Sequence, residues 1–135
     1  MIVDTSALYA FYDRRDRNHD QVVRVIMECT ASLVVSPLVI AELDYLVLSR
    51  LGTNAEIEVL GELSGGAWEL PTFGLNDLQR SLEIVRAYRD AKIGITAASN
   101  VALAERLGAE RIATLDRRHY SFLRLRSGKH LEIVP

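Results

Sequence analysis

Short apolar segments alternate with longer amphipathic segments along the whole chain, and this alternation is the strongest constraint on the fold. The apolar segments have the length and composition of buried strands, and they lie at residues 1–3, 33–36, 67–72, 111–116 and 130–135. Between them, apolar residues recur at helical spacing, and two of these segments end at Gly52 and Gly108. We expect helices at residues 6–12, 18–30, 37–51, 53–64, 78–90, 94–107 and 117–124. This order predicts an α/β fold: a three-layer α/β/α sandwich with a mainly parallel central sheet, in one domain over residues 1–135.

The composition is that of an ordinary globular protein, with 49% hydrophobic and 25% charged residues. The single cysteine, Cys29, excludes an internal disulfide and suits a reducing compartment. The most apolar window, residues 31–48, is interrupted by Glu42 and Asp44, so we expect no membrane span. The N-terminal segment has no basic leader before Asp4. Together these features predict a cytoplasmic protein.

The basic residues are concentrated near the C-terminal end, although the formal net charge of the chain is −2. Between Arg111 and His130, six Lys and Arg side chains accompany a single acid, Asp116. Such a segment suits contact with phosphate groups, but a solvated Arg-rich surface explains the charge pattern equally well.

Two of the expected strands end in an aspartate, since Asp4 follows MIV and Asp116 follows RIATL. The carboxyl ends of parallel strands meet at one edge of a sheet, where ligands bind. A third acid, Glu42, lies in an otherwise apolar helix, where its burial is costly unless it meets a cation. Each acid alone has a simpler explanation, because a strand-end aspartate is often a helix N-cap and Glu42 is a possible partner for an arginine.

Three acids at one sheet edge repel one another unless a divalent cation neutralises them. Carboxylates without Cys or His at ligand spacing favour Mg²⁺ or Mn²⁺ over Zn²⁺. Ser6 and Thr114 flank the two strand-end acids and are candidates to hydrogen-bond site ligands or metal-bound water. The histidines fall in no recognisable ligand spacing, so we expect surface or capping roles for His19, His119 and His130.

A resemblance to a known family is carried by three blocks of sequence: MIVDTSAL at 1–8, VIAELDYLV at 39–47 and IATLDRRHYSFLR at 112–124. Together they resemble a PIN-domain ribonuclease and, more narrowly, the VapC toxins of bacterial toxin–antitoxin pairs. The resemblance covers essentially the whole chain, in order and at the expected spacing. It implies Mg²⁺- or Mn²⁺-dependent cleavage of structured RNA such as tRNA or rRNA, inhibition by a VapB-type antitoxin, and a homodimer.

The resemblance also implies that Asp4, Glu42 and Asp116 are catalytic acids that hold the metal. The family has one more acid at the start of the helix before the ALAERLG run, and in this chain that position is Ala97. The leading hypothesis is therefore an endoribonuclease toxin whose activity is impaired by the missing carboxylate. The candidates for contact with RNA are Ser6, Thr114, Arg117, Arg118 and Arg124.

Two alternatives belong to other classes of protein. A degenerate PIN-like module that binds RNA or a partner without cutting is supported by Ala97. A phospho-acceptor receiver domain needs an acidic pair after its first strand, but Asp4 is followed by Thr5 and Ser6. The sequence therefore does not favour the receiver domain.

Overall fold

A three-stranded parallel sheet, in the order β1–β2–β3, forms the centre of the computed structural model, which describes residues 1–135. The strands are β1 (Ile2–Val3), β2 (Arg111–Ala113) and β3 (Glu132–Val134). Ile2 of β1 lies opposite Ile112 of β2, which in turn lies opposite Ile133 of β3. The central strand β2 thus pairs with both β1 and β3, although it begins more than a hundred residues after β1.

The expected strands at 33–36 and 67–72 are wrong in extent, because each contributes only one parallel bridge to the sheet. Val34 pairs with β1, and Glu69 pairs with Val34 on its outer side. The first segment is cut short because helix α3 starts directly after it. The second is followed by Pro71, which has no backbone N–H to continue a ladder.

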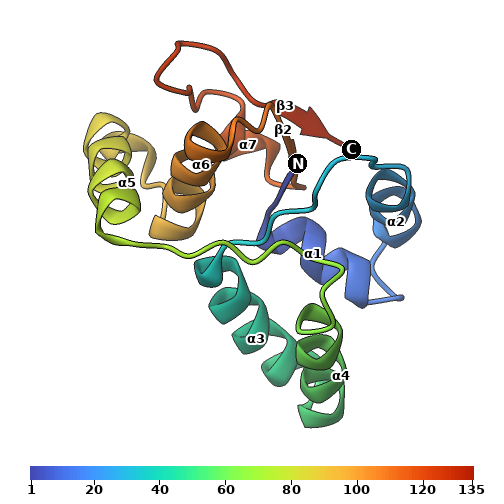
Figure 1. The fold of residues 1–135 in the computed structure, drawn as a ribbon. Helices are drawn as coiled ribbons and strands as arrows, with labels where there is room; N and C mark the ends of the chain where they lie inside the picture. Colours follow the sequence, from blue (N-terminus) through green and yellow to red (C-terminus); the bar gives the residue numbers. More distant parts are fainter.

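Helices cover both faces of the sheet (Figure 1). They are α1 (Thr5–Tyr12), α2 (His19–Met27), α3 (Pro37–Leu51), α4 (Thr53–Leu63), α5 (Leu75–Ala87), α6 (Ile95–Leu107) and α7 (Arg117–Tyr120), with a 3-10 turn η1 at Arg89–Ala91. In Figure 1, α5 and α6 lie on one side of the strands, α1 and α2 lie on the other, and the α3–α4 hairpin projects below them. The expected α/β/α arrangement with a parallel sheet is confirmed. None of these helices combines the length and the apolar character that crossing a bilayer requires.

Alternate strand residues point into two separate hydrophobic cores. Val3 and Ala113 pack with the side chains of α1 to α4, whereas Ile2 and Ile112 pack with those of α6 and its neighbours. Successive side chains of a strand point to opposite faces, so strands covered on both sides must be apolar throughout. The buried residues of β1 and β2 therefore leave no polar position in the middle of the sheet, and polar side chains are found only at the ends of the strands.

Four helix boundaries lie three or four residues from expectation, and one of them is the end of α5 at Ala87. Both α2, which ends at Met27, and α7, which ends at Tyr120, are shorter than predicted. Helix α5 begins earlier than predicted, at Leu75, because the Asp77 carboxylate accepts a 2.9 Å hydrogen bond from the Gly74 backbone N–H and so closes the first turn.

Candidate functional site

Asp4 is the centre of a dense hydrogen-bond network at the carboxyl ends of β1 and β2. The residue is only 7% exposed. Its Oδ1 accepts hydrogen bonds from Asn100 Nδ2 at 3.1 Å and from the Tyr120 hydroxyl at 3.0 Å. Its Oδ2 accepts from Ser6 Oγ at 2.8 Å and from Thr114 Oγ1 at 2.9 Å. The Ser6 backbone N–H makes a longer contact to Oδ2 at 3.4 Å. A carboxylate has about four lone-pair sites, so these donors fill its capacity.

Each donor to Asp4 comes from a different element of the fold. Asp4 is the N-cap of α1, which places Ser6 beside it, and Thr114 follows the last residue of β2. Asn100 lies in the second turn of α6, and Tyr120 is the last residue of α7. Burial and the negative charge of Asp4 both raise the pKa of Tyr120 well above its ordinary value, so the phenol keeps its proton and donates it.

Glu42 and Asp116 are linked to the same network. Thr5 Oγ1 donates to Glu42 Oε2 at 2.9 Å, and Thr5 is the neighbour of Asp4 in the chain. The backbone N–H of Asp116 donates at 3.0 Å to Thr114 Oγ1, the hydroxyl that donates to Asp4. The structure thus brings the three predicted acids to one edge of the sheet. Glu42 avoids the cost of burial that its apolar neighbours suggested, because its side chain lies on the exposed face of α3.

Asp116 caps α7 and is paired with a histidine. Its Oδ1 accepts from the His119 backbone N–H at 3.1 Å, and its Oδ2 lies 2.6 Å from His119 Nδ1. A histidine three residues after an N-cap acid is placed for both contacts, a spacing that sequence reasoning overlooked. The rings of His19 and His130 face backbone carbonyl groups instead, which agrees with the structural roles expected for them.

The donor atoms at this edge are oxygens only, which is the donor type that Mg²⁺ and Mn²⁺ prefer. Glu42 uses only one of its oxygens in a hydrogen bond and is exposed, so it is free to take a ligand. Nowhere in the molecule, however, do three or more His, Cys, Asp or Glu side chains lie close enough to hold a metal ion together. The residues therefore fit such a cation in chemistry, while the carboxylates fall short of a complete metal cage.

Ala97 occupies the third position of α6, and no acid lies in the first turn of that helix. Asn100 follows one turn later, on the same side of the helix, and this is the side chain that reaches Asp4. A longer acidic side chain at position 97 would therefore start from the helix face that meets Asp4. Nearby, Ser99 Oγ lies 3.1 Å from Ser36 Oγ at the start of α3, which ties α6 to the element that carries Glu42.

Ser6 and Thr114 support Asp4 rather than facing outward. Thr114 has no exposed surface, so the prediction that its side chain contacts RNA is wrong. It is buried because it follows β2 directly and its hydroxyl is used by Asp4 and by the Asp116 N–H. Ser6 is half-buried and shares the same role through its bond to Asp4.

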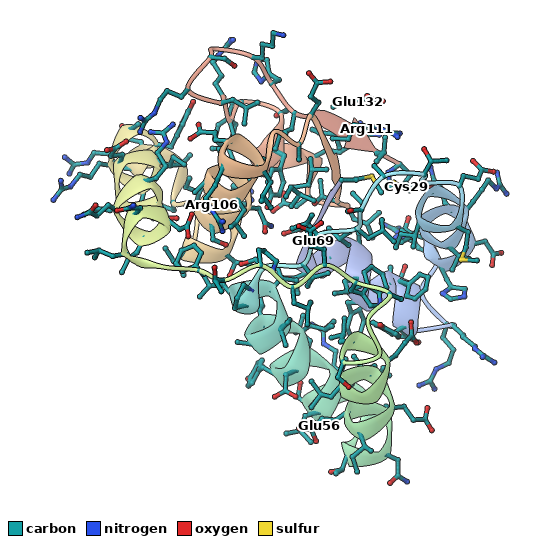
Figure 2. The ribbon with its side chains drawn as sticks, in the orientation of Figure 1. Cys29, Glu56, Glu69, Arg106, Arg111 and Glu132 are labelled. Carbon is teal, nitrogen blue, oxygen red and sulfur yellow. The ribbon has the colours of Figure 1, made fainter.

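Part of the basic C-terminal segment is engaged inside the molecule. Arg126 Nη2 lies 3.1 Å from Glu83 Oε2, and the Arg126 backbone N–H donates to Glu105 at 2.6 Å. Arg111 lies 3.4 Å from Glu132, and Figure 2 shows the two residues together at the β2–β3 end of the sheet. These arginines have carboxylate partners and are therefore poor candidates for phosphate contact.

The arginines around α7 are different, because Arg117, Arg118 and Arg124 are all exposed and none pairs with an acid. Arg117 donates to the carbonyl group of Pro135, and Arg124 donates to that of Gly128. Arg118 makes no side-chain hydrogen bond. These three arginines, which follow Asp116 in the chain, are therefore available to contact phosphate groups.

A cavity of about 790 Å³ lies elsewhere, between α5, the end of α6 and the segment before β3, and the three acids do not line it. Its charged groups neutralise one another, as in the ion pairs of Arg80 with Glu105 at 2.7 Å and of Arg106 with Asp77 at 2.8 Å. Arg106 lies on α6 in Figure 2. We therefore place the functional site at the acidic edge of the sheet rather than in this cavity.

Comparison with known proteins identifies the family of the chain. The family model for the PIN domain matches residues 1–125. Ribonuclease VapC26 of Mycobacterium tuberculosis is 48% identical to the chain over 135 residues, which is the full length of both. The chain belongs to the VapC family of PIN-domain proteins.

Two solved structures share the fold at low sequence identity. The crystal structure of VapC20 of M. tuberculosis, a toxin that cleaves the sarcin–ricin loop, superimposes with a TM-score of 0.84 at 16% identity, covering 99% of this chain and 98% of that one. The toxin–antitoxin complex from Klebsiella pneumoniae gives a TM-score of 0.70 at 14% identity, with 90% and 91% covered. At these identities the likeness concerns the fold alone.

For this VapC-family chain, sequence reasoning missed three residues of the Asp4 network: Thr5, Asn100 and Tyr120. Asn100 carried a signal, because it is an amide within a helix made mostly of Ala, Val and Leu, and such a residue needs a buried partner. Thr5 and Tyr120 carried no such signal. In the segments that contain Thr5 and Tyr120, a polar residue could just as well be exposed to solvent. Only the tertiary fold places these two side chains next to the acids.

Proposed function

We propose that this chain is a Mg²⁺- or Mn²⁺-dependent endoribonuclease toxin that cleaves structured RNA, and that Ala97 impairs its activity. The observation that carries the proposal is the convergence on Asp4, where four side-chain donors hold one carboxylate and Glu42 and Asp116 join the same network. Its VapC26 relative is a ribonuclease, and its structural neighbour VapC20 cleaves the sarcin–ricin loop. We propose tRNA or rRNA as the class of RNA that is cleaved. We also propose that residues 1–135 form a single nuclease domain that acts in the cytoplasm.

Asp4, Glu42 and Asp116 are the residues that would hold the cation. When bound, such an ion supplies a Lewis acid for the phosphate and an activated water for the attack. The surrounding side chains of this protein keep Asp4 in one orientation, and the exposed arginines 117, 118 and 124 would hold the RNA backbone through its phosphates. Attack of water at phosphorus breaks the P–O3′ bond, the 3′ oxygen takes up a proton, and the products are a 5′-phosphate and a 3′-hydroxyl.

Ala97 would leave this site one carboxylate short. An acid at position 97 would lie in the first turn of α6, where the helix dipole favours negative charge. Loss even of an outer-shell partner typically weakens metal binding or activity by about 10–100-fold. We therefore infer that the chain, with alanine at this position, binds metal weakly and cuts RNA slowly or not at all.

A VapB-type antitoxin is the partner we propose, with a homodimer of the chain as the second assembly. The antitoxin would place an arginine on the carboxylates of the acidic edge. Tyr45, Leu48, Ile57 and Leu60 are exposed on α3 and α4 and supply an apolar surface for either contact. Leu46 of α3 is not part of this surface, because it is half-buried against the core. A structural neighbour is itself a toxin–antitoxin complex.

The second candidate function is a degenerate PIN-like module that binds RNA or a partner without cutting. Two observations favour it: the first turn of α6 has no acid, and no three acids form a compact metal group. Restoring the acid separates the two candidates. The Ala97→Asp protein is incubated with total RNA and Mg²⁺, and the ends of the products are sequenced.

If the chain is a nuclease, the Ala97→Asp protein should cut RNA at discrete positions and leave 5′-phosphate ends. This cleavage should require Mg²⁺ and should be lost in an Asp4→Asn, Ala97→Asp double variant. If the Ala97→Asp protein retains its fold and its RNA affinity but makes no cuts, the binding module is the better description. Cuts that persist without Asp4 would instead mean that the acids are assigned to the wrong site.

A further inference from the structure

The two oxygens of the Asp4 carboxylate are held by different kinds of donors. Oδ1 is held by Asn100 and Tyr120, which are 0% and 2% exposed. Oδ2 is held by Thr114, which is fully buried, and by half-buried Ser6, through its hydroxyl and, at 3.4 Å, through its backbone N–H. Only Ser6 among these donors borders on solvent.

The donors to Oδ1 form a closed triangle. Asn100 Nδ2 donates both to Asp4 Oδ1 and, at 2.9 Å, to the hydroxyl oxygen of Tyr120, while Tyr120 gives its only proton to Asp4. Neither side chain can turn away without leaving another buried polar group unpaired. Asn100 Oδ1 is buried without a hydrogen-bond partner, which costs free energy. The amide nevertheless keeps the orientation in which its N–H groups point toward Asp4 and Tyr120.

Ser6 is bonded in a way that lets it release Asp4. Its Oγ lies 3.1 Å from Thr114 Oγ1, either oxygen of this pair can be the donor, and Ser6 Oγ also accepts the Leu115 backbone N–H at 3.0 Å. Because a hydroxyl hydrogen can rotate, Ser6 can direct its proton to Thr114 instead of to Asp4. This rotation withdraws the 2.8 Å hydroxyl contact from Oδ2, where Thr114 and the longer Ser6 N–H contact remain, and it leaves no buried group of Ser6 unpaired.

We propose that Asn100 and Tyr120 are positioning residues that reserve Oδ1 of Asp4, so that Oδ2 is the oxygen given to a divalent cation when Ser6 turns its hydroxyl away. The inference rests on the proposed function, since it requires a cation at Asp4. It assigns different roles to the hydroxyls of Ser6 and Tyr120, although both donate to the same carboxylate.

The test measures Mn²⁺ affinity by titration calorimetry on the full chain carrying Ala97→Asp, without RNA. Adding Tyr120→Phe removes one hydroxyl and should weaken Mn²⁺ binding by about 10–100-fold, the range found for outer-shell partners. Asn100→Ser should weaken it similarly. Ser6→Ala should leave the affinity unchanged or raise it, because it removes a competitor for Oδ2.

Tyr88→Phe is the matched control. The Tyr88 hydroxyl accepts the Arg124 backbone N–H at 3.2 Å, and its ring packs on Phe122 at 5.7 Å in the same half of the molecule. This variant therefore loses a tyrosine hydroxyl bond that does not involve Asp4, and its Mn²⁺ affinity should not change. Thermal unfolding of each variant ensures that binding is compared between folded proteins.

The inference is overturned if Tyr120→Phe binds Mn²⁺ as tightly as its parent, or if Ser6→Ala weakens binding as much as Tyr120→Phe does. A crystal structure of the Mn²⁺ complex in which Asp4 contacts the ion only through Oδ1 would overturn it as well. In these cases the proposed function stands, provided that Asp4→Asn abolishes binding. If the Ala97→Asp protein binds no Mn²⁺, or binds it equally well with Asp4→Asn, the proposed function fails and the inference fails with it.

Discussion

Asn100 lies one helical turn after Ala97 on α6, and its side-chain amide donates a 3.1 Å hydrogen bond to the Asp4 carboxylate. Helix α6 therefore already closes one side of the acidic edge, but with a neutral donor where a carboxylate would attract a cation. The backbone at position 97 is regular helix, so an acidic side chain can be added there without moving the chain.

Thermal unfolding with and without Mg²⁺ is expected to reveal the missing carboxylate. The Ala97→Asp protein should unfold at a lower temperature than the parent without metal, because the new charge is near other acids. Mg²⁺ at about 100 times its dissociation constant should add about 2.7 kcal/mol of stability by mass action. Ala97→Asn has a similar size and no charge, so its midpoint should respond weakly. Equal responses of the two variants would contradict a cation at this edge.

The salt dependence of RNA binding should depend on the exposed arginines around α7. Replacing Arg117 and Arg124 with glutamine should lower the affinity for RNA. It should also flatten the plot of log affinity against log salt concentration by about 0.7 for each single-strand phosphate that the protein no longer neutralises. Arg126→Gln is the control, because Arg126 is paired with Glu83 and should alter stability more than the salt slope. A slope that is unchanged in the double variant would mean that these arginines form only a solvated surface.

Expression with the neighbouring gene should yield a complex with a small antitoxin. Ile57 is 63% exposed on α4, and an Ile57→Glu substitution should reduce co-purification, because it places a charge in the apolar surface of α3 and α4. Met27, which is 74% exposed on α2, provides the control variant Met27→Glu. Size-exclusion chromatography with light scattering distinguishes loss of the antitoxin from loss of a homodimer. A chain that stays monomeric and without a partner in every case would argue against the toxin.

Acid should weaken the contact between α5, α6 and the segment that follows α7. Burial raises the pKa of Glu105, but hydrogen bonds from Arg80 and Arg126 outweigh it and lower the pKa below the usual value of 4.5. A lowered carboxyl pKa adds stability that is complete above the unfolded value and is lost as the pH falls through the folded one. Glu105→Gln should therefore lower the unfolding midpoint at pH 7, and its difference from the parent should shrink below about pH 4.5. Glu58 is exposed and forms no ion pair, so Glu58→Gln should show no such trend.

Much of the fold was predictable because its determinants are local. Ile2 and Val3 before Asp4, and Ile112 and Ala113 before Asp116, are apolar on both faces of the sheet, which indicates buried parallel strands without knowledge of their neighbours. The segments 33–36 and 67–72 have the same composition but pair through one residue each. Their extent depends on where the adjacent helix and proline begin, and periodicity does not reveal that.

The acids of the site were predictable, but the residues that orient them were not. Asp4 and Asp116 are visible because a charge ends an apolar run. The hydroxyls of Thr5 and Tyr120 become part of the site only through contacts with residues 37 and 116 positions away. Serine, threonine and tyrosine are common on surfaces, so their involvement depends on tertiary packing alone.

The order in which the chain is synthesised has a consequence for Asp4. It leaves the ribosome well before its partners Asn100, Thr114 and Tyr120, which follow 96, 110 and 116 residues later. Until these three residues have emerged, Ser6 is the only one of the four side-chain donors available to the Asp4 carboxylate. A nascent or prematurely terminated chain that stops before Tyr120 therefore lacks an organised acidic edge, however well its first helices have formed.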